Sequence, residues 1–248
     1  MNVRLPNFLL VGAPKCGTTS IVSYMSQHPD IYITPIKEPK FFTAQVLSFP
    51  LRGPGDAFVE NFTVKTYDVY KHLFSGWRHE RAIGDASVDN LYFYQQVIPL
   101  IKHYLGDVKI IIMLRNPIDR AFSAYKNLLR DERETLDFES ALAQEAKRAQ
   151  QGYEYLWRYL DLGFYYRQVR AYMESFSCVK VFILEHFNKG SWDIFGHICR
   201  FLGVDPTFTP GRRAHFNASG RPRFRWMQRL FNPTSFKGKA YKSLALNG

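Results

Sequence analysis

The sequence predicts an α/β fold in which helices form the outer layers of a three-layer α/β/α arrangement around a central parallel sheet of about five strands. Short apolar runs rich in β-branched residues, typical of strands buried in a parallel sheet, lie at 8–12, 81–87, 108–115 and 179–185. Helical patterns separate them, at roughly 19–29, 92–105, 117–130, 137–150, 163–176 and 191–202. Strands that alternate with helices favour a parallel sheet covered on both faces.

The first predicted strand ends in a glycine-containing turn. "FLLVG" (8–12) is followed by "APKCGTTS" (13–20) and then by an apolar helical pattern. The glycines keep the spacing of the phosphate-binding pattern G-x-x-x-x-G-K-[ST], but Thr18 fills the lysine position and Lys15 comes earlier. Such a turn offers unpaired backbone N–H groups and the positive end of a helix dipole. We therefore expect a P-loop-like fold whose turn holds a phosphate, the alternative being an ordinary strand-to-helix turn.

The displaced lysine predicts a different chemistry from that of a nucleoside triphosphatase. In the standard loop the lysine reaches the β- and γ-phosphates, while a serine or threonine binds Mg²⁺. Lys15 on the crest of the loop would instead lean over one terminal group and neutralise charge on a leaving oxygen without a metal. The loop is thus expected to hold one phosphate and one departing group, with no metal site.

The strand predicted at 108–115 leads into a second pattern, "RNPIDRAFSAYKNLLRDE". Arg115 lies at the carboxyl end of the strand, Pro117 suits a helix start, and Ser123 comes about two helical turns later. An arginine fork and a hydroxyl at the sheet edge would make a second anion site, where ligands of such sheets bind. Arg115 alone could equally form a surface salt bridge. Two anion sites suggest a ligand with two separated phosphates.

Length and composition bound the remaining possibilities. The 248 residues, 46% of them hydrophobic, suit a single domain spanning 1–248. The net charge of +11 favours anionic partners. Widely spaced Cys16, Cys178 and Cys199 give neither a disulfide framework nor a zinc pattern, and with no predicted secretory signal or membrane span we expect a cytoplasmic protein. The basic segment 209–248 could be a nucleic-acid arm or a flap over an anionic ligand.

Taken together, "GAPKCGTTS" (12–20) and "RNPIDRAFSAY" (115–125) resemble the sulfotransferases that use 3′-phosphoadenosine 5′-phosphosulfate (PAPS), particularly their carbohydrate and bacterial branches. "PIKEPKFF" (35–42) is similar to a K-E-P-x-F-F stretch of that family, and "FLGVDPTF" with "HFNASGRPR" is similar to its C-terminal region. The resemblance covers roughly residues 7–230. It implies an enzyme that moves the sulfuryl group of PAPS to a hydroxyl or amine of a small molecule or glycan by in-line displacement.

The resemblance also implies roles for particular residues. Lys15 would contact the bridging oxygen and sulfonate, and Glu38 would be the base, although Lys37 and Lys40 flank it and pairing with them is the alternative. Arg115 and Ser123 would hold the 3′-phosphate. The remaining nucleotide-binding residues would be Cys16, Gly17, Thr18, Thr19 and Ser20 in the loop and Ser219, Gly220 and Arg221 in the basic segment, which would partly cover the nucleotide.

This sequence departs from the family pattern on the acceptor side. Asp85 and Ser87 match an acidic stretch that follows a strand, but Val88 replaces its usual proline, and Lys40 stands where relatives often have histidine or asparagine. Glu185 matches an acidic position for which we expect a structural role. Both changes lie on the side where the family binds its acceptor, so the sequence does not decide between a glycan and a small-molecule acceptor.

Two other classes of function compete with this interpretation. A nucleotide kinase or triphosphatase would need its lysine after the second glycine and an acidic residue for Mg²⁺, which Glu185 or Asp85 could imitate. A non-catalytic module would bind nucleic acid or a glycan through its basic segment, with strong salt dependence. Because no nucleic-acid motif is present and both anion sites are intact, we expect no nucleic-acid partner. No sequence feature predicts an oligomeric state.

Overall fold

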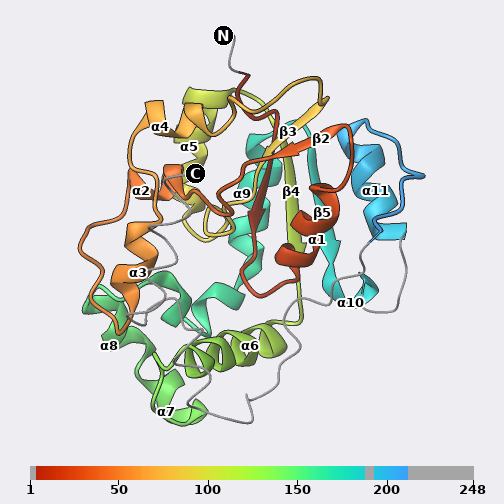
Figure 1. The fold of residues 1–248 in the computed structure, drawn as a ribbon. Helices are drawn as coiled ribbons and strands as arrows, with labels where there is room; N and C mark the ends of the chain where they lie inside the picture. The colour runs from red at the N-terminus through yellow and green to blue at the C-terminus, as the bar shows by residue number, and fades with distance from the viewer. Residues whose placement is uncertain (1–3, 188–192, 212–248) are drawn as a thin grey trace.

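A computed structural model describes residues 4–187 and 193–211, and within them it confirms the α/β prediction. In this part of the chain one five-stranded, all-parallel sheet has the order β2-β3-β1-β4-β5 (Figure 1). Its strands are β1 (Phe8–Gly12), β2 (Ile31–Ile33), β3 (Ala82–Asp85), β4 (Lys109–Leu114) and β5 (Val179–Ile183). Helices cover both faces, which gives the three layers that the sequence predicts.

The central strands form around continuous runs of buried apolar residues. All five residues of β1 are buried, and Ile110 to Met113 of β4 are fully buried between the helical layers. Close packing explains Gly84 of β3, because a Cβ there would lie 2.1 Å from the ring of Phe8. β2 was not predicted: it has three residues and lies at the sheet edge, where Tyr32 is partly exposed, so the apolar signal is short.

The longer helices match the predicted patterns. They are α1 (Thr18–Met25), α5 (Tyr94–Leu105), α6 (Pro117–Arg130), α9 (Tyr165–Ser175) and α11 (Asp193–Leu202). α1 and α11 pack together on one face, with the rings of Tyr24 and Phe195 6.2 Å apart, while α5 and α9 contact each other on the opposite face (Figure 1). Right-handed crossovers produce this arrangement, because the chain passes from β1 toward one edge and from β3 toward the other.

Several predicted boundaries were wrong. The helix expected at 137–150 is two short helices, α7 (Phe138–Ala143) and α8 (Glu145–Gln150), and the last strand ends before α10 (Leu184–Phe187). The excursion 43–66 and its flanks contain α2 (Phe41–Ala44), α3 (Asp56–Asn61) and α4 (Tyr67–His72). Two 3₁₀ turns, η1 (Tyr155–Trp157) and η2 (Asp161–Gly163), precede α9. Helices of one or two turns bury too few residues to produce a clear period in the sequence.

One buried carboxylate holds the excursion 43–66 in place. Asp56 is fully buried and accepts hydrogen bonds from the backbone N–H of Gly53 at 2.8 Å, the backbone N–H of Glu154 at 2.7 Å and the indole N–H of Trp157 at 3.0 Å. The guanidinium of Arg133 also donates to Asp56 and, at 2.8 Å, to the carboxylate of Glu154. These bonds join α3 to the segments on either side of α7 and α8, and they satisfy a charge that would otherwise be costly to bury.

The middle of the aromatic stretch 152–166 packs into the fold, while Phe164 and Tyr166 are exposed. Trp157 and Tyr159 are buried in a cluster with Ala124 and Leu128 of α6. The 3₁₀ turn η2, which lies in the same stretch, also contacts α6. Aromatic residues in this stretch therefore stabilise the position of α6 beneath the strand ends. Among the residues described, no helix is both long and apolar enough to cross a bilayer.

Candidate active site

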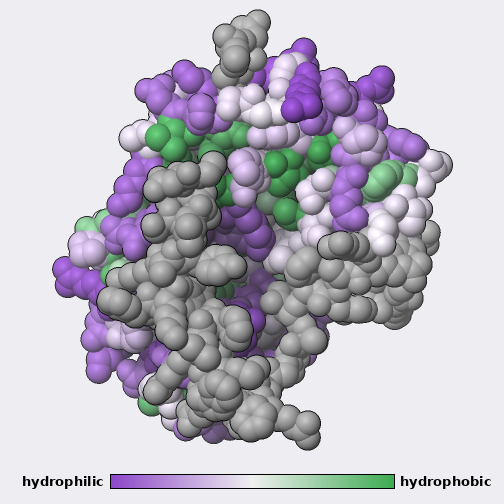
Figure 2. Space-filling view, in the orientation of Figure 1, coloured by the Kyte–Doolittle hydropathy of each residue, from purple (hydrophilic) through white to green (hydrophobic). Residues whose placement is uncertain are grey.

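The candidate site lies where the parallel strands end. Because all strands point the same way, the loop after β1 and the turn after β4 emerge at one edge of the sheet, above α6 (Figure 1). Hydrophilic residues lie in the middle of the face that Figure 2 shows, between the strand ends and α6. Within residues 4–187, every site residue predicted from the sequence lies in one of these loops, in α1, in α6 or in the segment after β2.

The loop after β1 has left-handed backbone conformations at two residues. Gly17 precedes α1 with a left-handed φ of 78°, which favours glycine, and a Cβ there would also lie 2.5 Å from the Leu184 side chain. Lys15 also has a positive φ of 69°, which is unusual for a residue with a Cβ. No side chain caps α1 and no acidic residue lies in its first turn, so its first N–H groups and the helix dipole face the loop.

Lys15 reaches from this loop to α6. Its Nζ donates a hydrogen bond to Oδ1 of Asn127 at 2.6 Å. Burial, followed by the positive charge of Arg130, lowers the pKa of Lys15 from 10.5 to about 8. The ammonium is thus still charged at neutral pH but poorly hydrated, which strengthens its attraction to a negative group.

Cys16 and Thr18 are buried beneath the loop rather than turned toward its concave side. The Cys16 thiol lies 3.7 Å from the carbonyl oxygen of Pro14 and 3.8 Å from the hydroxyl of Tyr165. Burial raises its pKa to about 12, so it stays a neutral packing group. Any contact of Cys16 or Thr18 with a ligand would therefore come chiefly from the backbone, whereas Thr19 and Ser20 are partly exposed.

The segment after β2 brings the predicted base over the loop. The ammonium of Lys37 donates to the hydroxyl of Thr19 at 2.7 Å and pairs with the carboxylate of Glu38 at 3.1 Å. Glu38 is partly exposed and has a left-handed φ of 59°. The pairing that the sequence left open as an alternative therefore exists, but with Lys37 only, and it places Glu38 beside the loop instead of away from it.

Lys40 has a different partner from the one that the sequence suggested. Its Nζ lies 3.6 Å from the carboxylate of Glu154, and its backbone N–H donates to the Ser87 hydroxyl at 2.9 Å. Although burial opposes it, the negative charges of Asp89 and Glu154 raise the pKa of Lys40, so it stays protonated. Lys40 thus fixes the end of the segment that carries Glu38, a contact across more than a hundred residues that the sequence does not reveal.

Asp85 and Ser87 form the support for this segment. Asp85 is fully buried, and its Oδ1 accepts bonds from the backbone N–H of Ser87 at 2.9 Å and from the Ser87 hydroxyl at 2.7 Å. Its Oδ2 accepts from the Tyr70 hydroxyl at 3.0 Å. Burial raises the pKa of Asp85 to about 6. Because the Ser87 hydroxyl in turn accepts from the backbone N–H of Lys40, the buried side chains of Asp85 and Ser87 support the segment that carries Glu38.

The second predicted anion site lies at the turn from β4 into α6. Arg115 is partly buried directly after β4, and Ser123 is partly buried on α6. Between them Asn116 caps α6, its Oδ1 accepting from the backbone N–H of Ile118 at 2.9 Å. The carboxylate of Glu185 accepts from the backbone N–H of Asn116 at 2.8 Å, which gives Glu185 the structural role expected from the sequence.

Ser123 and Asn127 share one face of α6, since they are four residues apart. The same helix therefore carries the predicted 3′-phosphate ligand and the partner of Lys15. Asn127 was missed in the sequence because only the fold brings it to the loop. The predicted ligands Ser219, Gly220 and Arg221 lie outside the described residues, as does the basic segment beyond residue 211.

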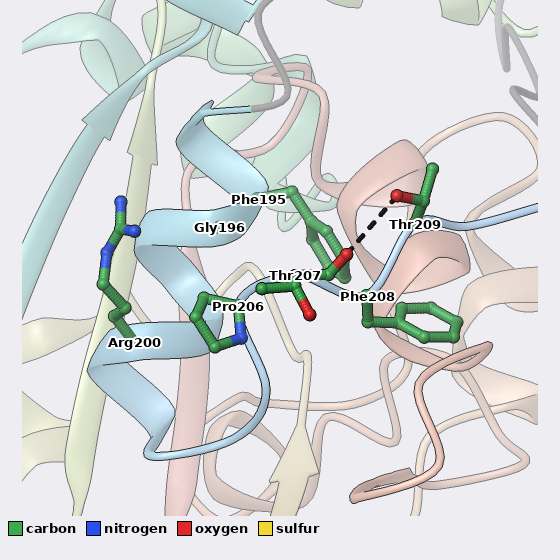
Figure 3. Close-up of a pocket in the computed structure, with 7 residues that line it drawn as sticks. All are labelled: Phe195, Gly196, Arg200, Pro206, Thr207, Phe208 and Thr209. Atoms are coloured by element: carbon green, nitrogen blue, oxygen red, sulfur yellow. Dashed lines mark hydrogen bonds between the residues drawn. The ribbon is translucent and has the colours of Figure 1, made fainter.

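A separate pocket of about 250 Å³ lies between α11 and the chain that follows it (Figure 3). Phe195, Gly196 and Arg200 of α11 line one side, and residues 206–209 line the other. None of the predicted catalytic or nucleotide-binding residues lines it. Among the described residues, no group of three or more His, Cys, Asp or Glu side chains is placed to hold a metal ion.

Comparisons with known proteins agree with this fold. A crystal structure of a sulfotransferase from Alicyclobacillus acidocaldarius is 43% identical, with a TM-score of 0.82, and the match covers 93% of this chain and 92% of that one. A mouse sulfotransferase solved in complex with adenosine 3′,5′-bisphosphate (PAP) is 18% identical with a TM-score of 0.53 over 83% of this chain and 61% of that one, which shows a shared fold.

Sequence relatives include human carbohydrate sulfotransferase 15, 23% identical over 169 residues, or 56% of this chain and 30% of that protein. Human bifunctional heparan sulfate N-deacetylase/N-sulfotransferase 2 is 32% identical over 126 residues, or 50% of this chain and 13% of that protein. The chain thus spans at most about a third of the length of these relatives. A family model described as the sulfotransferase family matches residues 6–169, well over half of the sequence. On these matches the chain belongs to the sulfotransferase family.

Proposed function

We propose that this protein transfers the sulfuryl group of PAPS to a hydroxyl or amine of an acceptor. The observation that supports this most directly is the meeting of three segments at one sheet edge. The loop after β1 carries Lys15, which donates a hydrogen bond to Asn127 of α6 at 2.6 Å. The segment after β2 carries Glu38, and its neighbour Lys37 contacts both the Glu38 carboxylate at 3.1 Å and the Thr19 hydroxyl at 2.7 Å. A cation on a phosphate-type loop and a carboxylate beside that loop are the two groups that this transfer requires.

The residues present fit the nucleotide. The left-handed backbone of Gly17 and the uncapped start of α1 suit the 5′-phosphate. Backbone N–H groups of residues 16–19, with the hydroxyls of Thr19 and Ser20, would hold it. Arg115 and Ser123 would hold the 3′-phosphate, and Ser219, Gly220 and Arg221 of the basic segment would add to that site. When bound, PAPS supplies an activated sulfuryl group on a phosphate leaving group.

Lys15 and Glu38 would divide the chemistry between them. Lys15 is cationic and largely removed from water, so it would stabilise negative charge on the leaving phosphate oxygen. Lys37, which contacts both Thr19 and Glu38, holds Glu38 beside the loop. The Glu38 carboxylate would accept the proton of the attacking hydroxyl or amine. Both groups can act without a metal ion, and we propose a metal-independent displacement.

The family comparison also supports proposals about acceptor and setting. Two relatives carry carbohydrate or heparan sulfate in their names, so we propose a glycan or small-molecule acceptor with no nucleic-acid partner. Cys16, Cys178 and Cys199 are free thiols, which suits a reducing compartment such as the cytoplasm. The resemblance to a bacterial enzyme over nearly the whole length favours a single sulfotransferase domain across 1–248 and a bacterial source.

Thermal unfolding with PAP tests the nucleotide site without knowledge of the acceptor. A ligand present at about 100 times its dissociation constant adds roughly 2.7 kcal/mol of stability, so the midpoint should rise clearly with PAP and without Mg²⁺. ATP or GTP with Mg²⁺ serves as the comparison. Stabilisation by the triphosphates but not by PAP would contradict the proposal and favour a nucleoside triphosphatase.

A further inference from the structure

The contact between Lys15 and Asn127 joins two parts of the chain that are 112 residues apart. Asn127 lies in the last turn of α6, and its Oδ1 accepts from the Lys15 ammonium at 2.6 Å. This is short for a nitrogen-to-oxygen hydrogen bond, as expected when the donor carries a charge. It fixes the far end of a flexible side chain that starts from a strained loop residue.

The orientation of the Asn127 amide is determined by its neighbours. Nδ2 donates to the Asp131 carboxylate at 2.9 Å, while Oδ1 also accepts from the Arg130 guanidinium at 3.3 Å. Arg130 in turn pairs with Asp131 at 3.0 Å. A flipped amide would turn its NH₂ group toward two cations, so the network selects the orientation that offers an oxygen to Lys15.

Charged groups from two segments face Lys15. Arg130 and Asp131 approach from the end of α6, and Lys37 and Glu38 approach from the segment after β2. The two cations disfavour the Lys15 ammonium and the two carboxylates favour it, while burial disfavours it most. Asn127 is a neutral acceptor among these charges: it stabilises the ammonium without neutralising it.

We propose that Asn127 is the positioning residue of Lys15, holding the ammonium charged and aimed across the loop. This inference rests on the proposed function, since it assigns a partner to the lysine proposed to stabilise the leaving oxygen. An uncharged partner leaves the full positive charge available to the leaving group, and its single hydrogen bond can be exchanged for one to that group. A carboxylate in the same place would hold the lysine in an ion pair.

The first test measures the ionisation of Lys15 itself and needs no activity. The full-length protein is acetylated with limiting acetic anhydride over a range of pH, and modification of Lys15 is quantified by mass spectrometry. Asn127→Ala removes the acceptor of the ammonium, so the pKa of Lys15 should fall below that of the wild type. Asn127→Asp adds a negative charge, so the pKa should rise. The exposed Asn61→Ala, at the end of α3, is the matched control and should leave it unchanged.

The second test separates turnover from binding. Asn127→Ala should lower kcat about tenfold, the loss expected for one hydrogen bond to a charged group, and should change the KM for PAPS much less. The alkaline limb of its pH profile should move to lower pH, because the ammonium is lost earlier. Asn127→Asp should move that limb to higher pH while also lowering kcat, since the ion pair competes with the leaving oxygen. Circular dichroism confirms that each variant is folded.

The outcomes distinguish this inference from the proposed function. If neither variant at position 127 changes the pKa of Lys15 or the pH profile, the positioning role is wrong, whatever the enzyme does. If the wild type transfers no sulfuryl group from PAPS while labelling still shifts in opposite directions for the two variants, the contact stands and the proposed function fails. If Lys15→Ala abolishes transfer but Asn127→Ala matches the wild type, Lys15 acts without Asn127.

Discussion

Individual charges in this protein take their roles from what surrounds them. Three lysines near the loop have different partners. Lys15 donates to the neutral amide of Asn127, whereas Lys37 contacts the Thr19 hydroxyl and the partly exposed carboxylate of Glu38. Lys40 pairs with the buried carboxylate of Glu154. Of the three, Lys15 is the one whose hydrogen-bond partner carries no negative charge. Lys15 is therefore the cation best suited to a developing negative charge.

Replacement of Glu38 by glutamine separates a catalytic from an organising role. Glu38→Gln keeps the shape of the side chain and removes the base, so kcat should fall by about 100-fold or more. The affinity for PAP, measured by calorimetry, should change little, because the carboxylate pairs with Lys37 and is not among the groups proposed to hold the nucleotide. A collapse of PAP affinity with preserved kcat would mean that Glu38 organises the loop.

Arg115 is the residue whose replacement should reveal the position of the 3′-phosphate. Arg115→Ala should weaken PAP by about tenfold to a hundredfold, the range for a lost charge-assisted hydrogen bond. Adenosine 5′-phosphate lacks the 3′-phosphate, so its affinity should change far less. Calorimetric titration of both nucleotides gives the comparison, and an equal loss for both would place the 3′-phosphate elsewhere.

At the scale of elements, the site depends on contacts between the ends of β1, β3 and β4 and the start or end of α1 and α6. A chain of hydrogen bonds surrounds the end of β3: the hydroxyls of Tyr70 and Ser87 donate to Asp85, and the backbone N–H of Lys40 donates to the Ser87 hydroxyl. This chain fixes the segment that carries Glu38 against the sheet. The local match of Asp85 and Ser87 to the family pattern therefore has a structural cause.

The protonation of Asp85 should be visible as a pH dependence of stability. Burial raises its pKa from 3.8 to about 6, so between these values the folded protein binds more protons than the unfolded chain. The free energy of unfolding contributed by this group is then fully present below about pH 4 and is lost as the pH rises through about 6. Its size is of the order of 3 kcal/mol.

Asp85→Asn removes this titration and keeps a carbonyl oxygen for Ser87. Urea unfolding between about pH 4 and pH 6 should therefore show a flatter dependence of stability on pH in the variant than in the wild type. Asp68→Asn, on the exposed surface of α4, is the matched control. Identical slopes for the wild type and Asp85→Asn would show that Asp85 is already ionised across this range.

At the scale of the whole molecule, sequence patterns predicted the layers but not the contacts between them. β1 and β4 were identifiable because they contain runs of four or more buried apolar residues, whereas β2, with Ile31 alone buried, was not. The loop carrying Lys15 was identifiable because its glycine spacing is local. Asn127 and Glu154 were not, since an asparagine on a helix and a glutamate in a loop gain their roles only when distant segments meet.

The buried carboxylate of Asp56 divides the long connection between β2 and β3. Because its partners come from residues 133 to 157, the connection is attached at its middle as well as at its ends. Two short loops confine the chain more than one long loop does, since the entropy of a loop grows with its length. Insertions or exchanges on either side of Asp56 can thus be accommodated separately, which makes these two loops independent positions for engineering around a constant nucleotide site.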